Sequence, residues 1–274
     1  MAGPVEGGPP RGRARPQPGG APAPAVQRLT IRYAKRGGMR FASHRDVARA
    51  IERGVRKAGL PVAYSAGFSP HPKISYSGGA PTGAASEAEY LDMSLTRRCE
   101  PADVGRRLDA ALPDGIDVID VAEADGKSAA QLEASAWEVT WPGVTPAAAA
   151  AAAAEFLAAG TVEVSRLTPK GMRRLDARAA VISLDVRSAD GRRADPDQAG
   201  GPAILRMVVR QVTPAVRPDD VLAALGQSSA FATAAPLPAP AAPPPLVARL
   251  WQGPLSDLTR NRDFLTTAHI RPCA

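Results

Sequence analysis

Two spacings of hydrophobic residues occur in turn along this chain, and they predict its secondary structure. Alternation of hydrophobic and polar residues is typical of strands, and hydrophobic residues that recur every three to four positions are typical of amphipathic helices. The alternation over 29–41 predicts a strand, or a short hairpin around two glycines, that ends near Phe41. A helix is expected next, because Ser43 is a suitable N-cap for the apolar residues that follow at helical spacing. These residues are Val47, Ile51, Val55 and Ala58.

The rest of the first half predicts two more strands, a second helix and a last strand. A loop rich in turn-forming residues spans 63–75, and extended segments are expected at 74–76 and 90–95. Pro101 begins a helical pattern, and the apolar residues at 116–121 predict a strand. The resulting order, βαββαβ, is that of the ferredoxin-like fold, in which two helices cover one face of a four-stranded antiparallel sheet.

The second half repeats this order, so we expect an α+β protein built from tandem ferredoxin-like domains with antiparallel sheets. The expected strands lie at 137–141, 162–167, 181–186, 204–212 and 246–251, and the expected helices at 147–154 and 218–225. The two domains are expected to span 27–126 and 135–252. Pro-, Gly- and Ala-rich composition predicts a disordered N-terminal arm, 1–26, and two disordered insertions, 188–202 and 227–245. A C-terminal tail, 253–274, follows.

Composition excludes several classes of protein. The 274 residues contain no apolar run of membrane-spanning length, and the first twenty residues contain no apolar signal segment, so we expect a cytoplasmic protein with no membrane partner. Two cysteines, Cys99 and Cys273, are too few for a disulfide framework, a four-thiolate zinc site or a three-cysteine iron–sulfur cluster. Phosphate-loop, dinucleotide-binding and HExxH motifs are absent from the sequence. We therefore expect neither a cofactor nor a metal in this chain.

Charge is unevenly distributed along the basic chain, whose net charge is +7. Residues 28–75 contain eleven basic and two acidic side chains, a net charge of +9, whereas residues 76–135 contain five basic and twelve acidic ones, a net charge of −7. Because like charges gather in separate segments, the two segments favour different partner surfaces. The acidic segment is expected to contact a partner protein, and the basic segment is expected to bind a polyanion.

The basic residues of the first predicted helix recur at i, i+4, i+8 and i+11, so they form one row along it. Arginines in a row can contact successive phosphates, although a solvated helix face gives the same pattern. RNA is favoured over double-stranded DNA, because no DNA-binding motif is present, and transfer or ribosomal RNA is the expected class. The second basic group, around 166–178, extends the surface or forms a solvated hairpin tip. The predicted nucleic-acid contacts are Arg40, Arg45, Arg49, Arg53, Arg56, Lys73, Lys170, Arg173 and Arg174.

Candidate catalytic residues lie at the start of the first helix and in the loop after it. If the fold brings them together, His44 and His71, with Tyr64 and Lys73, supply a base, an acid and a cation for metal-independent cleavage of a phosphodiester. The alternative gives both histidines structural roles, beside a helix cap and between two prolines. The residues available for a metal site have no recognisable ligand spacing; they are His71, Glu87, Glu89 and Asp92.

Aromatic residues in the same loop offer a further contact with nucleic acid. The loop motif consists of Gly67, Phe68, Pro70 and Pro72. Phe68, Tyr64 and Tyr76 are candidates for stacking on an unpaired base, but Phe68 and Tyr76 are more simply interpreted as core residues in a chain with 4% aromatic residues.

The stretch from Met39 to Leu95 resembles a bacterial family of unknown function, the radical SAM-linked proteins. The resemblance rests on a Ser43-His44-Arg45-Asp46 helix start, a Pro70-His71-Pro72-Lys73 loop and the segment 86–92. It extends weakly over 28–250. It implies that the domain works alone or fused behind a cobalamin-binding radical SAM enzyme. This chain lacks the three cysteines of such an enzyme, so the resemblance implies a separate radical SAM partner.

Three functional hypotheses follow from the sequence. The first is a non-catalytic, RNA-binding accessory module that works with a radical SAM enzyme or with RNA-processing machinery. The second is a metal-independent endoribonuclease that uses His44 and His71. The third is a protein-interaction module that presents a substrate to a radical SAM partner through the acidic region 87–133.

Overall fold

The computed structural model describes residues 22–124, 132–169, 171–188, 201–229 and 243–258. Its first half begins with strand β1 (Gln27–Lys35), the 3-10 turn η1 (Gly37–Phe41) and helix α1 (His44–Lys57). Strands β2 (Ile74–Ser77) and β3 (Ala85–Leu95), helix α2 (Pro101–Asp109) and strand β4 (Ile116–Glu123) follow. This is the predicted order of elements.

The second half has the same order with one addition. It contains β5 (Ala134–Trp141), α3 (Pro146–Ala158), β6 (Glu163–Thr168), β7 (Gly171–Asp176), α4 (Ala177–Ala180), β8 (Val181–Arg187), β9 (Ala203–Arg210), α5 (Pro218–Gly226), β10 (Leu246–Gly253) and α7 (Leu255–Leu258). Strands β6 and β7 pair only with each other, as a separate antiparallel hairpin.

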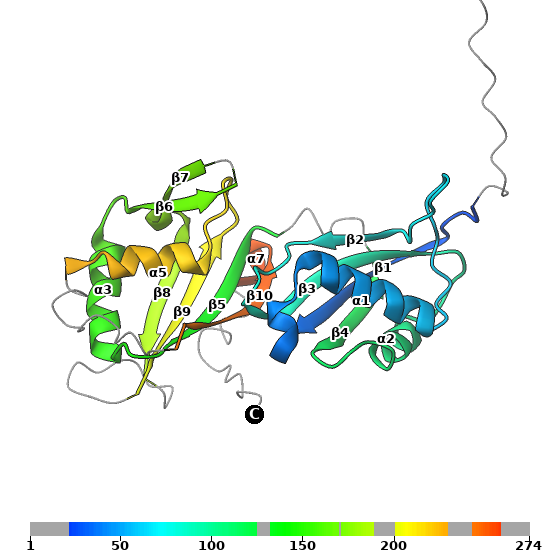
Figure 1. Cartoon of the computed structure of the whole chain (residues 1–274), viewed down its shortest axis with the longest axis horizontal. Coiled ribbons are helices and arrows are strands. Elements are labelled where there is room, and N and C mark those ends of the chain that lie inside the picture. Colours follow the sequence, from blue (N-terminus) through cyan, green and yellow to red (C-terminus); the bar gives the residue numbers. More distant parts are fainter. Residues whose placement is uncertain (1–21, 125–131, 170, 189–200, 230–242, 259–274) are drawn as a thin grey trace, which may run out of the picture.

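The main sheet has eight strands and joins the two halves (Figure 1). Within the first half the strand order is β4-β1-β3-β2, and within the second it is β10-β5-β9-β8; all these pairs are antiparallel. The halves meet where β10 pairs in parallel with β3, through Ala248↔Ala85 and Arg249↔Ser86. The molecule is thus an α+β protein with one large, mostly antiparallel sheet.

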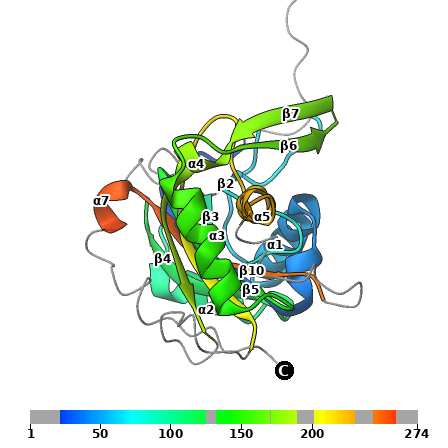
Figure 2. The same ribbon diagram turned by 90° about the vertical axis from the view of Figure 1, so that its left-hand side faces the viewer.

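Each half has its own hydrophobic cluster. In the first, α1 packs Val47, Ile51 and Val55 toward Leu29 and Leu91 of the sheet. In the second, the alanine-rich α3 buries four alanines against β8 and β9, because small side chains allow a close approach. Figure 2 shows α1 and α5 on one side of the sheet and the short α7 on the other.

Several predicted boundaries were wrong. The first strand ends at Lys35 rather than near Phe41, because Gly37 adopts φ +51° and Met39 N–H donates to Arg36 O in the 3-10 turn. The strand predicted at 162–167 is present as β6, but it pairs with β7 in a hairpin outside the main sheet, and β7 and α4 were not predicted. Most of the predicted arm, of both insertions and of the tail lies outside the described residues.

Gly115 lies where its backbone comes close to the backbone of Arg36. It has φ +86°, and a Cβ there would lie 2.7 Å from the backbone oxygen of Arg36. We expect Gly115→Ala to lower the free energy of unfolding by about 3 kcal/mol, from left-handed strain together with the backbone clash. The matched control is Gly37→Ala, which has φ +51° but open space around the added Cβ, with an expected loss of about 1 kcal/mol. Urea titration measures both; equal losses would contradict the role of the close approach.

Candidate nucleic-acid interface

Helix α1 presents a row of arginines to solvent. Ser43 caps the helix by accepting a hydrogen bond from Asp46 N–H at 3.3 Å, as predicted. The buried residues lie on one face, and the opposite face presents exposed cations. These cations, the α1 arginine row, are Arg45, Arg49, Arg53 and Arg56, with Lys57 beside them. Residues four apart are separated by about 6 Å along the helix, so the row extends over about 16 Å.

Two acids of α1, Asp46 and Glu52, lie next to the α1 arginine row, but among the described residues only Asp46 forms an ion pair with it. Arg49 lies 3.9 Å from Asp46, and both side chains are largely exposed, so this pair contributes little. No ion pair joins Arg53 or Arg56 to an acid in the part of the chain that the structure describes. A concentrated and weakly paired positive charge of this kind attracts polyanions.

Arg40, also predicted as a contact, has a different environment. Its guanidinium lies 4.6 Å from the centre of the Phe41 ring, and the half-buried side chain places Nε where solvent does not reach it. Arg40 therefore packs against the protein beside the row rather than extending it.

The loop between α1 and β2 holds a defined shape. Its base continues the sheet, because Ala63 N–H donates to Ser94 O at 2.8 Å and Lys73 N–H donates to Ala63 O at 2.7 Å. Nearer the tip, His71 N–H donates to Ser65 Oγ at 3.0 Å. Figure 1 shows this loop at the outer end of the first half. Residues 64–72 are called the projecting loop from here on.

Phe68 is presented at the tip of the projecting loop. Its side chain is 88% exposed, so the interpretation of Phe68 as a core residue was wrong. Tyr76 does pack against the core, where its hydroxyl lies 3.4 Å from Ala48 O. The flanking run of Ser, Gly and Pro was the available sequence signal for exposure. An uncovered aromatic ring on a shaped loop is suited to stacking on an unpaired base.

The predicted pair of histidines is not brought together. The His44 ring packs edge-on against Tyr76, with ring centres 5.3 Å apart. His71 precedes Tyr76 by five extended residues, roughly 16 Å of chain. The projecting loop and its base contain Tyr64, His71 and Lys73, and they precede β2. His44 lies near the other end of β2. The predicted catalytic group of four residues does not form.

His44 instead lies above a loop at the junction of the halves. Its Nδ1 is 3.4 Å from the point where a Cβ on Gly79 would stand, and a carboxylate oxygen of Glu89 is 3.9 Å from that point. Glu89 accepts hydrogen bonds from Ala80 N–H at 3.2 and 3.3 Å. His44 therefore contacts the loop that follows β2, and hydrogen bonds to the buried Glu89 carboxylate hold this loop in place.

A buried ionic cluster fixes this junction. Glu89 of β3 and Arg249 of β10 form an ion pair with each partner about 95% buried. Arg249 also donates to Ser86 Oγ at 3.1 Å and to Gln252 Oε1 at 3.0 Å, and its guanidinium lies over the Trp137 ring. Sequence reasoning missed this cluster, because 160 residues separate the two charges.

The same cluster contains a buried lysine. Lys35 Nζ donates to the backbone oxygens of Ala80 and Pro81, both at 3.3 Å. Burial lowers the pKa of Lys35, and the Glu89 carboxylate opposes the shift. Burial likewise lowers the pKa of Arg249, and burial together with Glu89 raises the pKa of the Tyr33 hydroxyl. The charged groups of the cluster form ion pairs and hydrogen bonds with one another and with the backbone. This arrangement is typical of a structural role at the junction.

The basic residues of the second predicted group have different environments in the structure. Arg173 is exposed on β7, whereas Arg174 pairs with Glu163 across the hairpin. Arg166 forms an ion pair with the buried Asp220, and Arg178 donates to backbone oxygens of the second half. Lys170 lies outside the described residues. Only Arg173 of the described members is therefore unpaired and open to solvent on the hairpin.

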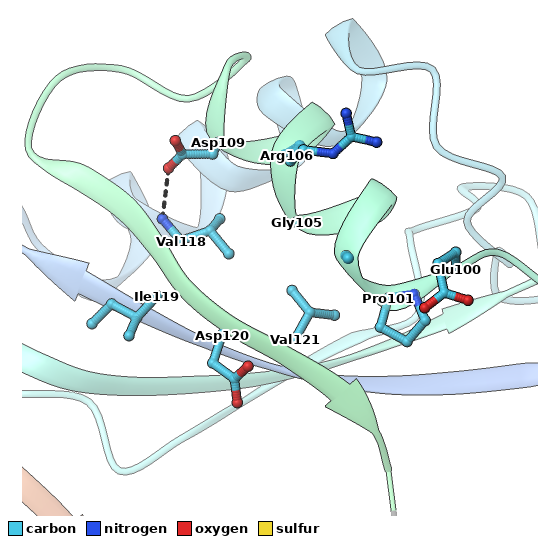
Figure 3. A pocket seen from close by; sticks show the side chains of 10 residues that line it. Glu100, Pro101, Gly105, Arg106, Asp109, Val118, Ile119, Asp120 and Val121 are labelled. Carbon is cyan, nitrogen blue, oxygen red and sulfur yellow. Dashed lines mark hydrogen bonds between the residues drawn. The ribbon is translucent and has the colours of Figure 1, made fainter.

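Three acidic residues of the first half, Glu100, Asp109 and Asp120, line a shallow groove between α2 and β4 together with Arg106 (Figure 3). The groove encloses about 560 Å³, and Val118 and Val121 lie along it. At its rim Asp109 accepts a hydrogen bond from Val118 N–H at 2.8 Å. This surface is distinct from the α1 arginine row.

The residues considered for a metal are engaged elsewhere. Glu87 pairs with Arg36, Glu89 with Arg249, and Asp92 accepts from Thr30 Oγ1 at 2.6 Å. Among the described residues, no three His, Cys, Asp or Glu side chains are grouped to hold a metal ion. No helix of the described part is both long and apolar enough to span a membrane.

Comparisons with known proteins find weak structural similarity. A chain from a crystal structure of a Cbf5-Nop10-Gar1 complex aligns with 87% of this chain at 13% identity and a TM-score of 0.40. The alignment covers 56% of that chain, so this protein spans about half its length. An unknown protein from Galdieria sulphuraria aligns with 73% of this chain and 90% of its own at 14% identity, with a TM-score of 0.21. These scores carry no argument, and no curated protein matches.

A family model covers most of the described structure. It matches residues 28–218, which include the α1 arginine row, the projecting loop and the β6–β7 hairpin. The description of that family is an uncharacterized protein conserved in bacteria. On this match, the chain belongs to the bacterial family DUF2344.

Proposed function

We propose that this protein is a non-catalytic RNA-binding module whose contact surface consists of the α1 arginine row and the projecting loop. The exposed, weakly paired row is the observation that carries the proposal. Its arginines follow one helix face, so they can contact neighbouring phosphates of a single strand. Phe68 adds an aromatic face beyond the base of the loop. Phosphate contacts supply affinity, and the aromatic ring supplies a preference for unpaired bases.

The architecture supports RNA over double-stranded DNA as the ligand. Sequence-specific recognition of RNA commonly uses unpaired bases and aromatic side chains. The exposed Phe68 fits that mode.

We further propose that each half is a ferredoxin-like unit. The strand orders β4-β1-β3-β2 and β10-β5-β9-β8, with a helix after the first and third strand of each half, support this assignment. The β6–β7 hairpin and α4 then stand as an insertion before β8.

The resemblance to radical SAM-linked proteins adds a proposed context. In this proposed context, the RNA-binding module works with a separate radical SAM enzyme or with RNA-processing machinery. The acidic groove between α2 and β4 supports a protein contact at a surface away from the α1 arginine row. Both partners can then be bound together.

Substitution of Phe68 tests the proposed stacking. We expect Phe68→Ala to weaken binding of a single-stranded RNA by about tenfold, because base stacking on one aromatic ring contributes about 1–3 kcal/mol. Binding of a fully paired RNA duplex should change little. Fluorescence anisotropy measures both affinities, and Phe68→Leu tests whether the ring rather than apolar bulk is needed. Unchanged single-strand affinity in Phe68→Ala would remove the projecting loop from the interface.

A further inference from the structure

Strand β4 forms one edge of the main sheet. It stands at the end of the strand order and pairs only with β1 among the described strands. Hydrogen-bonded and non-hydrogen-bonded residue pairs alternate along an antiparallel ladder. The alternation is fixed by Ala124, whose N–H donates to Arg28 O at 2.9 Å. The N–H and C=O groups of Val121 and Glu123 therefore point away from β1, and an edge of this kind is a template for a further strand.

The open part of this edge is short. A register shift leaves Ile119 opposite no residue of β1, and such a bulge interrupts regular pairing. On the other side of the bulge, the outward N–H of Val118 already donates to the Asp109 carboxylate of α2. Bulges and covering side chains commonly protect sheet edges, but here they stop short of Val121. A segment that pairs with β4 therefore does so over residues 120–123.

Helix α2 lies beside this edge and forms one wall of the groove described above. Val118 and Val121 are directed toward α2, whereas Asp120 points away from it (Figure 3). A Cβ on Gly105 would lie 3.1 Å from Val121 Cγ2, so the helix and the strand approach each other closely. Side chains of a paired strand alternate between the two faces of a sheet. A residue paired with Val121 thus directs its side chain to the α2 side, where an apolar one is expected.

The charges around the groove favour a basic partner. Asp120 is exposed and forms no ion pair with another described residue, and its neighbour on β1, Arg32, donates to a backbone oxygen of β3. Glu100 is also exposed, and its side chain does not cap α2. The cation of the groove lining, Arg106, pairs with Asp103 at 3.0 Å. Because opposite charges stabilise cross-strand pairs, a lysine or arginine is expected opposite Asp120.

We propose that the outer edge of β4 binds an extended segment of a partner protein, added to the sheet as an antiparallel strand in which basic and apolar side chains alternate. The apolar side chains lie on the α2 side, and the basic ones lie beside Asp120 on the other face. In this mode of recognition, backbone hydrogen bonds provide affinity and alternate side chains provide specificity. The inference rests on the protein contact proposed at this groove and states the chemistry of the segment that binds there. RNA binding by the α1 arginine row does not depend on it.

A peptide of about seven residues, in which lysine and valine alternate, is the probe, since this is an ordinary length for a strand. Fluorescence anisotropy measures its affinity for the full chain in the absence of RNA. In the proposed register the valines lie opposite Val121 and Glu123 and direct their N–H groups toward β4, whereas the lysine N–H groups point outward. N-methylation of the central valine should weaken binding by about tenfold or more, because a hydrogen bond is lost and the methyl group blocks the approach of the peptide. N-methylation of a central lysine is the matched control and should change the affinity little.

Charge reversal on the protein tests the expected position of the basic side chains. Asp120→Lys should weaken binding of the peptide by about fivefold, because repulsion replaces attraction across the two strands. Asp114→Lys makes the same change in net charge at an exposed position outside the groove, and it should retain the affinity. Both variants replace exposed side chains, so they should fold as the wild type does, and circular dichroism checks this.

Amide exchange shows the pairing directly. With the peptide bound, the Val121 and Glu123 amides should exchange more slowly with solvent, as followed by NMR. Binding without this protection, equal losses from the two N-methylated peptides or equal losses for the two variants would overturn the inference. A dissociation constant above about 1 mM for the unmodified peptide would overturn it as well. Each of these results leaves the proposal of RNA binding standing, because RNA is absent from the experiment.

Discussion

Replacement of Arg249 by methionine is expected to lower the free energy of unfolding by about 3–5 kcal/mol, because it leaves the Glu89 carboxylate buried without its partner. The loss is a large fraction of the stability of a typical domain. Arg249 also donates to Ser86 and Gln252, and these acceptors lose their donor in the same variant. Since the residue joins β10 to β3, both halves should lose stability together.

Two matched variants separate the buried ion pair from a general effect of charge removal. Arg36 pairs with Glu87 and Asp117 at the surface, so Arg36→Met should cost about 1 kcal/mol or less. The double variant Glu89→Met/Arg249→Met should be more stable than Arg249→Met alone, because it removes the unpaired charge. Chemical denaturation measures all three. Equal losses for Arg249→Met and Arg36→Met would contradict the structural role of the cluster.

Charge reversal in the α1 arginine row should have the largest effect on RNA binding. We expect Arg49→Glu/Arg53→Glu to weaken binding of single-stranded RNA by about 100-fold or more, since two charge-assisted contacts are lost and repulsion replaces them. Both side chains are exposed, so the fold should be unaffected. Fluorescence anisotropy at fixed salt measures the change.

The control for this variant carries the same change in net charge elsewhere. Arg106→Glu/Arg210→Glu reverses two exposed arginines, one on α2 beside the acidic groove and one at the end of β9. It should retain most of the affinity, because long-range attraction between exposed charges is screened by salt. A loss equal to that of the α1 variant would mean that net charge, rather than the row, attracts the RNA.

The sequence predicted the features that depend on neighbouring residues. The cap at Ser43, the apolar face of α1 and the exposure of its arginines follow from helical periodicity, and all three were confirmed. The order of elements in the first half followed from alternating patterns of the same local kind.

The missed features depend on contacts between distant segments. Strand β6 has the composition of a regular strand, but which strand pairs with it is decided by the whole sheet. The pairing of Glu89 with Arg249 has no local signal. The distance between His44 and His71 depends on the direction of β2, which the sequence left open. The exposure of Phe68 ran against the usual burial of aromatic residues.

The dependence of RNA affinity on salt tests the central claim most directly. For the wild type, the logarithm of the association constant should fall linearly with the logarithm of salt concentration, with a slope of about −3 if the four arginines of the row each contact a phosphate of a single strand. The slope of Arg49→Glu/Arg53→Glu should be smaller in magnitude by at least about 1.4. An affinity that is unchanged between about 50 and 200 mM salt, or equal slopes for the two proteins, would contradict the proposal that this row binds RNA.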